Sequence, residues 1–174
     1  MQRGRAQDDE TAVSRGCTIN HRTWYDMETQ PGLPLRITVL HPPPGVALAV
    51  QKGRDELLPP SRQTADEAVF DFTVRIGTQP DGRPNFLGPF AQGTPADRFV
   101  YVNSGKRAGQ QDSGWDRRAK VKLGGITPKM VDAALAEPGA VLVARFEGVG
   151  RDGGPACATV PLLDGGWRLV RGGG

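Results

Sequence analysis

Residues 68–76 read AVFDFTVRI, and this stretch shows the pattern that decides the fold. Every second residue from Phe70 to Ile76 is apolar, while polar and charged residues such as Asp71 and Arg75 stand between them. Successive side chains of a β-strand point to opposite faces of the sheet, so this alternation predicts a strand with one buried and one wetter face. On the wetter face, Asp71 is expected to be solvated or salt-bridged.

The same alternation recurs along the chain from Leu35 onward, and clusters of glycine, proline and aspartate separate the segments. Together they predict about eight strands. Residues 35–40 and 46–51 flank the turn HPPPG (41–45) and are expected to pair with each other. The segments are LRITVL (35–40), VALAVQ (46–51), RFVYVNS (98–104), RAKVKLGG (118–125), AVLVARFE (140–147), ACATVPLL (156–163) and WRLV (167–170).

One helix interrupts these strands, in the segment GGITPKMVDAALAEPG (124–139). Thr127 is a typical N-cap residue and Pro128 suits the first helical turn. Short strands with one helix, without alternating strand–helix units, predict a mainly β fold: an antiparallel β-sandwich or a partly open barrel. The apolar residues expected on the buried face of the helix are Val131, Ala134 and Leu135.

The first 34 residues differ from the rest of the chain. They contain three branched aliphatic residues among many polar and charged ones, too few to offset the entropy of ordering the chain. The sequence therefore predicts a mobile N-terminal tail over residues 1–34 and a single β-rich domain over residues 35–171. In the alternative interpretation, Trp24 and Tyr25 anchor a short element on this domain.

The distribution of cysteines and apolar residues bears on where the protein works. Cys17 and Cys157 lie far apart and are too few for a disulfide framework, which suits a reducing compartment. The N-terminal segment lacks the apolar core of a secretory signal, and no apolar run is long enough to span a membrane. A soluble, cytoplasmic protein without a membrane partner is expected.

The stretch FEGVGRDGGPACATV (146–160) places Gly148, Gly150 and Gly153 at the spacing G-x-G-x-x-G. A dinucleotide-binding loop needs a helix after its third glycine and an acidic residue about 20 positions later. Here a strand-like segment follows, and too few residues remain for the second half of such a unit. The loop is predicted to be a hairpin that joins two adjacent strands, with LLDGGWR (162–168) as a second hairpin turn.

Other catalytic patterns give weak signals. His21 and His41 lie in the predicted tail and beside three prolines, where a catalytic triad or a multi-histidine metal site has few partners. Cys157 has no basic partner in its predicted strand, which favours a small buried side chain over a nucleophile. No metal site and no cofactor are predicted, and the balance is against an enzyme.

Positive charge is concentrated in the middle of the chain. Residues 98–122 contain seven arginines and lysines against two aspartates, whereas the whole chain has a net charge of +3. A solvated strand face explains this pattern without a ligand, and the alternative is an anion-binding or nucleic-acid-binding surface. The residues of this candidate anion site are Arg117, Arg118, Lys120 and Lys122.

Two connecting segments, 84–98 and 104–117, mix aromatic and polar residues, and long connections of this kind are often functional. Phe86, Leu87 and Phe90 are expected to close the core. The candidate ligand-binding residues in these segments and the strand between them are Gln92, Arg98, Asn103 and Trp115.

Three stretches together resemble a known family: PNFLGPFAQGTPADRFVYV (84–102), RRAKVKLGGIT (117–127) and GGPACATVPLL (153–163). The family is an uncharacterised bacterial group of small domains, the domain-of-unknown-function family numbered fifty-nine ninety. The resemblance covers about residues 35–170. It implies a compact bacterial domain, supplies no activity or site residues, and leaves the first 34 residues outside the family core.

Function is thus unknown from the sequence, and three hypotheses remain open. The preferred one is a non-catalytic binding or interaction module for a small ligand or a protein. The second is a small enzyme with a loop-built site around Arg98, Asn103 and Trp115. A weak nucleic-acid or anion binder that uses the basic strand face ranks third, because Tyr101 and Trp115 are the aromatic residues near that face that suit base stacking.

Overall fold

The computed structural model describes residues 30–54, 56–105 and 115–171. All of these except Gln30 belong to a compact unit that begins at Pro31. The interpretations of residues 1–29 as a mobile tail, with or without anchoring by Trp24 and Tyr25, lie outside the described residues. Among the described residues, no helix combines the length and apolar character needed to cross a membrane.

The first of two sheets has the strand order β12-β10-β1-β5-β4, with β6 also paired to β5. Its centre is β1, which pairs with β10 on one side and β5 on the other. β1 begins before residue 35, and Leu33 is fully buried within it. The strands are β1 (Gly32–Leu40), β4 (Arg62–Gln63), β5 (Glu67–Thr78), β6 (Pro84–Leu87), β10 (Val141–Glu147) and β12 (Arg168–Val170).

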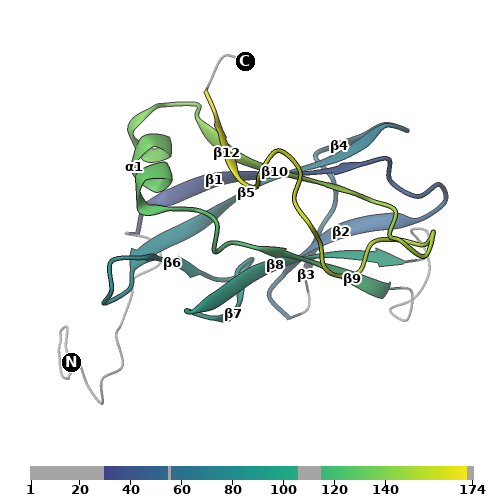
Figure 1. The fold of residues 1–174 in the computed structure, drawn as a ribbon, viewed down its shortest axis with the longest axis horizontal. Coiled ribbons are helices and arrows are strands. Elements are labelled where there is room, and N and C mark those ends of the chain that lie inside the picture. Colours follow the sequence, from purple (N-terminus) through teal and green to yellow (C-terminus); the bar gives the residue numbers. More distant parts are fainter. Residues whose placement is uncertain (1–29, 55, 106–114, 172–174) are drawn as a thin grey trace. The chain divides into compact units, whose positions relative to one another are not determined.

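The second sheet has the order β11-β9-β8-β2-β3, with β7 also paired to β8. Figure 1 shows the two sheets as separate layers. The strands of the second sheet are β2 (Ala47–Lys52), β3 (Glu56–Leu58), β7 (Gln92–Thr94), β8 (Asp97–Gly105), β9 (Trp115–Lys122) and β11 (Ala158–Thr159).

The mainly β, sandwich-like fold predicted from the alternation is confirmed. Most strand pairs are antiparallel, but β1 with β10 and β9 with β11 are parallel, so both sheets are mixed. The expected pairing of β1 with β2 is wrong, because these strands lie in different sheets. His41 and Gly45, with φ values of 52° and 76°, lie in the turn that carries the chain between the layers.

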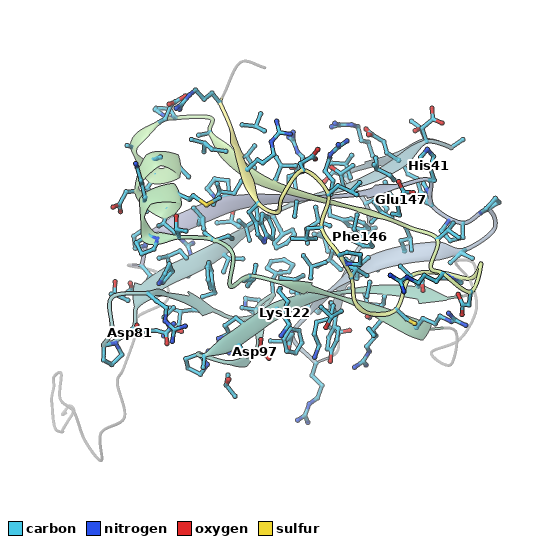
Figure 2. The ribbon with its side chains drawn as sticks, viewed as in Figure 1. His41, Asp81, Asp97, Lys122, Phe146 and Glu147 are labelled. Carbon is cyan, nitrogen blue, oxygen red and sulfur yellow. The ribbon has the colours of Figure 1, made fainter. Side chains whose placement is uncertain are left out.

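The core consists of the apolar side chains that alternate along both sheets. In β5 the inward residues from Phe70 to Ile76 are buried, while Asp71 lies 2.7 Å from Arg36 of β1 as an ion pair. The predicted closing residues Phe86, Leu87 and Phe90 are buried too. Figure 2 shows Phe146 between the two layers, with the polar side chains of both sheets around the outside.

Helix α1 (Pro128–Ala136) follows β9 and contacts β1, β10 and β12 of the first sheet. The predicted N-cap is confirmed: the backbone N–H of Met130 donates to Thr127 Oγ1 at 3.1 Å. Val131 and Ala134 are buried as expected. Leu135 is 40% exposed, so its assignment to the buried face is wrong. The buried face of this short helix is thus narrower than the spacing predicts and consists of Val131 and Ala134.

Candidate functional site

The glycine loop, residues 148–156, connects β10 to β11 and is closed by its own backbone. Gly150 N–H donates to Gly154 O at 2.7 Å, and Ala156 N–H donates to Gly148 O at 2.9 Å. No helix follows the third glycine in the described residues; the chain continues into β11. The turn is hairpin-like, but β10 and β11 lie in different sheets, so the prediction that it joins adjacent strands is wrong.

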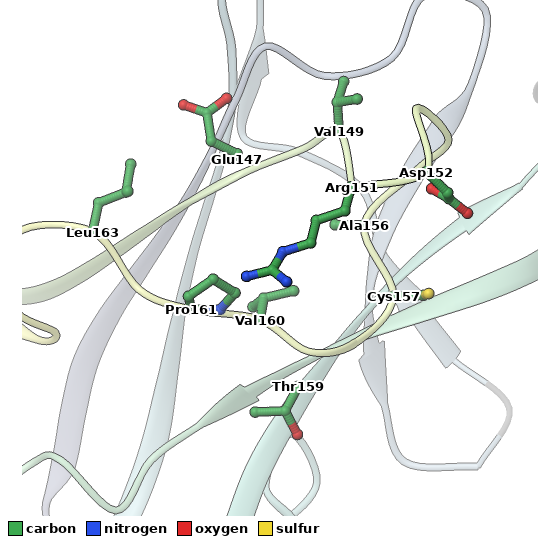
Figure 3. Close-up of a pocket in the computed structure, with 11 residues that line it drawn as sticks. Glu147, Val149, Arg151, Asp152, Ala156, Cys157, Thr159, Val160, Pro161 and Leu163 are labelled. Carbon is green, nitrogen blue, oxygen red and sulfur yellow. The ribbon is translucent and has the colours of Figure 1, made fainter.

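A cavity of about 490 Å³ lies beside this loop, at the end of the sandwich where the chain passes from the first sheet to the second. Ligand sites are commonly concave, mostly apolar and of this size. Figure 3 shows the residues around it. The lining residues are Glu147, Val149, Gly150, Arg151, Asp152, Ala156, Cys157, Thr159, Val160, Pro161 and Leu163.

Arg151 is the cation of this cavity. Its side chain extends across the cavity toward Pro161 and Val160 (Figure 3). Among the described residues, its guanidinium has no hydrogen-bond or ion-pair partner. A guanidinium presents five donors in a planar fork that matches a carboxylate or phosphate.

Both carboxylates that line the cavity are paired with side chains other than Arg151. Asp152 Oδ2 accepts from Arg117 Nη1 at 2.9 Å, and Glu147 Oε1 lies 2.9 Å from His41 Nδ1. Figure 3 shows both carboxylates pointing away from the Arg151 guanidinium. The pairing with Arg117, together with the Gly154 N–H, lowers the pKa of Asp152 below its usual value. Arg151 itself is exposed, so its guanidinium is open to solvent and to a bound ligand.

Cys157 is exposed and lines the cavity, so its prediction as a small buried side chain is wrong. The next residue, Ala158, has a φ of 58°, which breaks the strand alternation on which that prediction rested. Arg117 Nη1 lies 3.8 Å from Cys157 Sγ and also donates to Pro155 O at 3.2 Å. Arg117 thus anchors the glycine loop through its contacts with Asp152 and Pro155.

The pairing of His41 with Glu147 predicts a titration shift. Hydrogen bonding to Glu147 and its negative charge raise the pKa of His41 above 6.5. A raised histidine pKa stabilises the fold below its unfolded-state pKa, and this contribution is lost as the pH rises through the folded-state pKa. We expect NMR titration to give His41 a pKa above 6.5, and Glu147→Gln to lower it. An unchanged pKa in Glu147→Gln would exclude this pairing in solution.

The four ligand-binding candidates do not form one site. Arg98 and Asn103 lie five residues apart on β8, roughly 17 Å along the strand, and alternate to opposite faces of the second sheet. Asn103 is 3% exposed and donates to Gln51 Oε1 at 2.6 Å. Gln92 donates to Pro89 O on the β7 side, and Trp115 begins β9 opposite Gly105.

The four anion-site candidates also separate. Arg118, Lys120 and Lys122 share the outer face of β9, whereas Arg117 faces the glycine loop. Lys122 forms an ion pair with Asp97 at 2.5 Å (Figure 2). Arg118 lies 5.0 Å from the centre of the Tyr101 ring, and Lys120 lies 4.2 Å from that of Phe99. Two of the four charges are thus neutralised by carboxylates, and two rest on aromatic rings.

In a comparison with protein families, residues 33–170 fit the model of a family of unknown function, DUF5990. The chain belongs to this family. No curated protein and no solved structure matches the chain.

In this DUF5990 domain, the matched residues include every strand from Leu33 onward, helix α1 and the whole glycine loop. All of the residues that line the cavity lie within the matched range. Within the described ranges, no group of three or more His, Cys, Asp or Glu side chains is placed to hold a metal ion. The glycine spacing of this loop does not single out Arg151. The sequence signal that points to Arg151 is a cationic residue in a glycine-rich loop next to an apolar stretch.

Proposed function

We propose that the protein is a binding module for a small ligand that carries an anionic group on an apolar body, held in the cavity beside the glycine loop. The observation that carries this proposal is the unpaired guanidinium of Arg151 in a cavity whose two carboxylates are already paired. An anionic group on the ligand would supply the missing partner through charge-assisted hydrogen bonds.

The rest of the cavity favours an apolar ligand body. Val149 is 41% exposed, although it is a large apolar side chain, and it lies on the cavity wall. Val160, Pro161 and Leu163 line the wall as well. Covering such surface on binding contributes about 25 cal/mol per Å² of apolar area removed from water. Binding is thus expected to need both parts of the ligand.

A matched series of probes tests this proposal: 2-naphthoate, the neutral 2-naphthylmethanol and the cationic 2-naphthylmethylamine. These share an apolar ring system and differ in charge. We expect 2-naphthoate to shift the amide signals of residues 149–154 saturably and to slow the alkylation of Cys157, which lines the same cavity. The amine should do neither.

The variant Arg151→Gln is expected to weaken 2-naphthoate binding about ten- to hundredfold, because a hydrogen bond to a charged group contributes about 1.5–3 kcal/mol. Arg54→Gln removes the same charge from an exposed position that does not line the cavity, and should leave affinity unchanged. Equal losses in both variants would mean that net charge alone attracts the probe. Equal binding of all three probes would show that Arg151 does not select the ligand.

A further inference from the structure

A second arginine occupies an unusual place at the opposite end of the second sheet. Arg98 lies on β8 in alternation with Val100 and Val102, which are 0% and 2% exposed and face the core. Phe99 and Tyr101 lie on the outer face, where they meet the cations of β9. Arg98 is thus a cation on the side of the strand that otherwise carries core residues.

The hydrogen bonds of Arg98 are incomplete. Its Nη1 donates to Gly93 O at 2.6 Å, but its Nε is enclosed and has no partner in the described residues. Burial lowers the pKa of Arg98, which shows that the surroundings disfavour its charge. The neighbouring Asp97 pairs with Lys122, and no described carboxylate pairs with Arg98. A partly buried charge without an ionic partner costs free energy.

Arg98 lines a cavity of about 160 Å³. Since each water in the liquid occupies roughly 30 Å³, it has room for about five groups of that size. Arg83 also lines it, and is itself paired with Asp81 at 2.7 Å. Thr127 and Pro128, at the N-terminus of α1, form another part of the wall. The positive end of the helix dipole thus adds to the charge of Arg98.

We infer that this second cavity binds a small oxyanion group, a phosphate or a carboxylate, with Arg98 as its main ligand. The observation that supports this inference is the Arg98 guanidinium without an ionic partner. The N-terminus of α1 strengthens the positive field around it. Phe86 and Ile126 also line the cavity, so it excludes water around part of the bound group. This site is separate from the cavity of Arg151 and does not depend on the function proposed for that cavity.

The test uses the full chain with two probes, inorganic phosphate and acetate, each titrated while amide signals are followed. We expect saturable shifts at Arg98, Ile126, Thr127 and Lys129 with at least one probe. The probe with the higher affinity identifies the group. Arg98→Gln should weaken that affinity at least tenfold, whereas Arg151→Gln and Arg54→Gln should leave it unchanged.

A second variant and a second measurement cover the case in which Arg98→Gln does not fold. Arg98→Lys keeps the charge but loses the planar fork, and should bind more weakly than the wild type. The preferred probe should also raise the Tm of the wild-type protein, because a ligand of the native state stabilises it. Absence of saturable shifts with both probes would overturn the inference, as would equal affinity in the wild type, Arg98→Gln and Arg98→Lys.

Discussion

Replacing Phe146 by alanine is expected to lower the free energy of unfolding by about 3–5 kcal/mol. Phe146 is 2% exposed and lies on β10 directly opposite Val39 of β1. Its side chain fills the space between the two layers (Figure 2), so its removal leaves a cavity that the surrounding strands cannot fill. Urea denaturation measures the loss, and the Tm should fall by roughly 10 °C or more.

The control for this prediction lies on the same strand. Val143 of β10 is only partly buried, so Val143→Ala should cost well under the loss for Phe146→Ala. Phe146→Leu retains most of the apolar volume and should cost about 1–1.5 kcal/mol. If Phe146→Ala destabilises no more than Val143→Ala, the two sheets do not pack around Phe146 as the structure shows.

The second large effect is expected for Gly93→Ala, which should lower the free energy of unfolding by about 2–3 kcal/mol. Gly93 has a φ of 91°, a conformation that costs a residue with a Cβ roughly 1–2 kcal/mol. A Cβ added there would also overlap the backbone carbonyl oxygen of Asp97 and lie 2.7 Å from the Phe99 ring. Neither the hairpin backbone nor a buried ring can move aside easily.

Gly82→Ala is the matched control for this variant. Gly82 has a φ of 90°, but a Cβ there would meet nothing within 4 Å. The difference between the two variants therefore measures the steric term alone. Because Gly93 O accepts the hydrogen bond from Arg98, Gly93→Ala should also weaken oxyanion binding near Arg98, whereas Gly82→Ala should not. Equal destabilisation by both substitutions would contradict the close packing of the β7–β8 hairpin.

Local patterns in the sequence predict the faces of the strands well. In 118–123 the residues Ala119, Val121 and Leu123 are buried as the alternation requires, and Thr127 caps the helix with its own side chain. Such features depend on neighbouring residues, which the sequence displays directly. The same alternation says nothing about which strand lies alongside. For this reason the pairing of β1 with β2 was wrong.

The two candidate sites depend on contacts between residues far apart in the chain. The two carboxylates that line the cavity of Arg151 pair with His41 and Arg117, which lie far from them in the chain. His41 lies 106 positions from Glu147 in the chain. Alternation within β8 is enough to place Arg98 on the core side, but the cavity beside it is lined by residues of segments 79–86 and 124–128, which only the fold brings together. No periodicity within one segment reveals such relations.

The parallel pairing of β1 with β10 has a consequence for synthesis of the protein. Leu35 has Leu142 as its partner in the register, so one edge of β1 can be covered only after most of the chain has been made. β5 can pair with the other edge much earlier. At about 5–20 residues per second, the ribosome needs roughly 5–20 s to make the intervening chain. During that interval β1 presents free backbone amides and carbonyls beside an apolar face, and the nascent chain is then most exposed to aggregation and most dependent on chaperones.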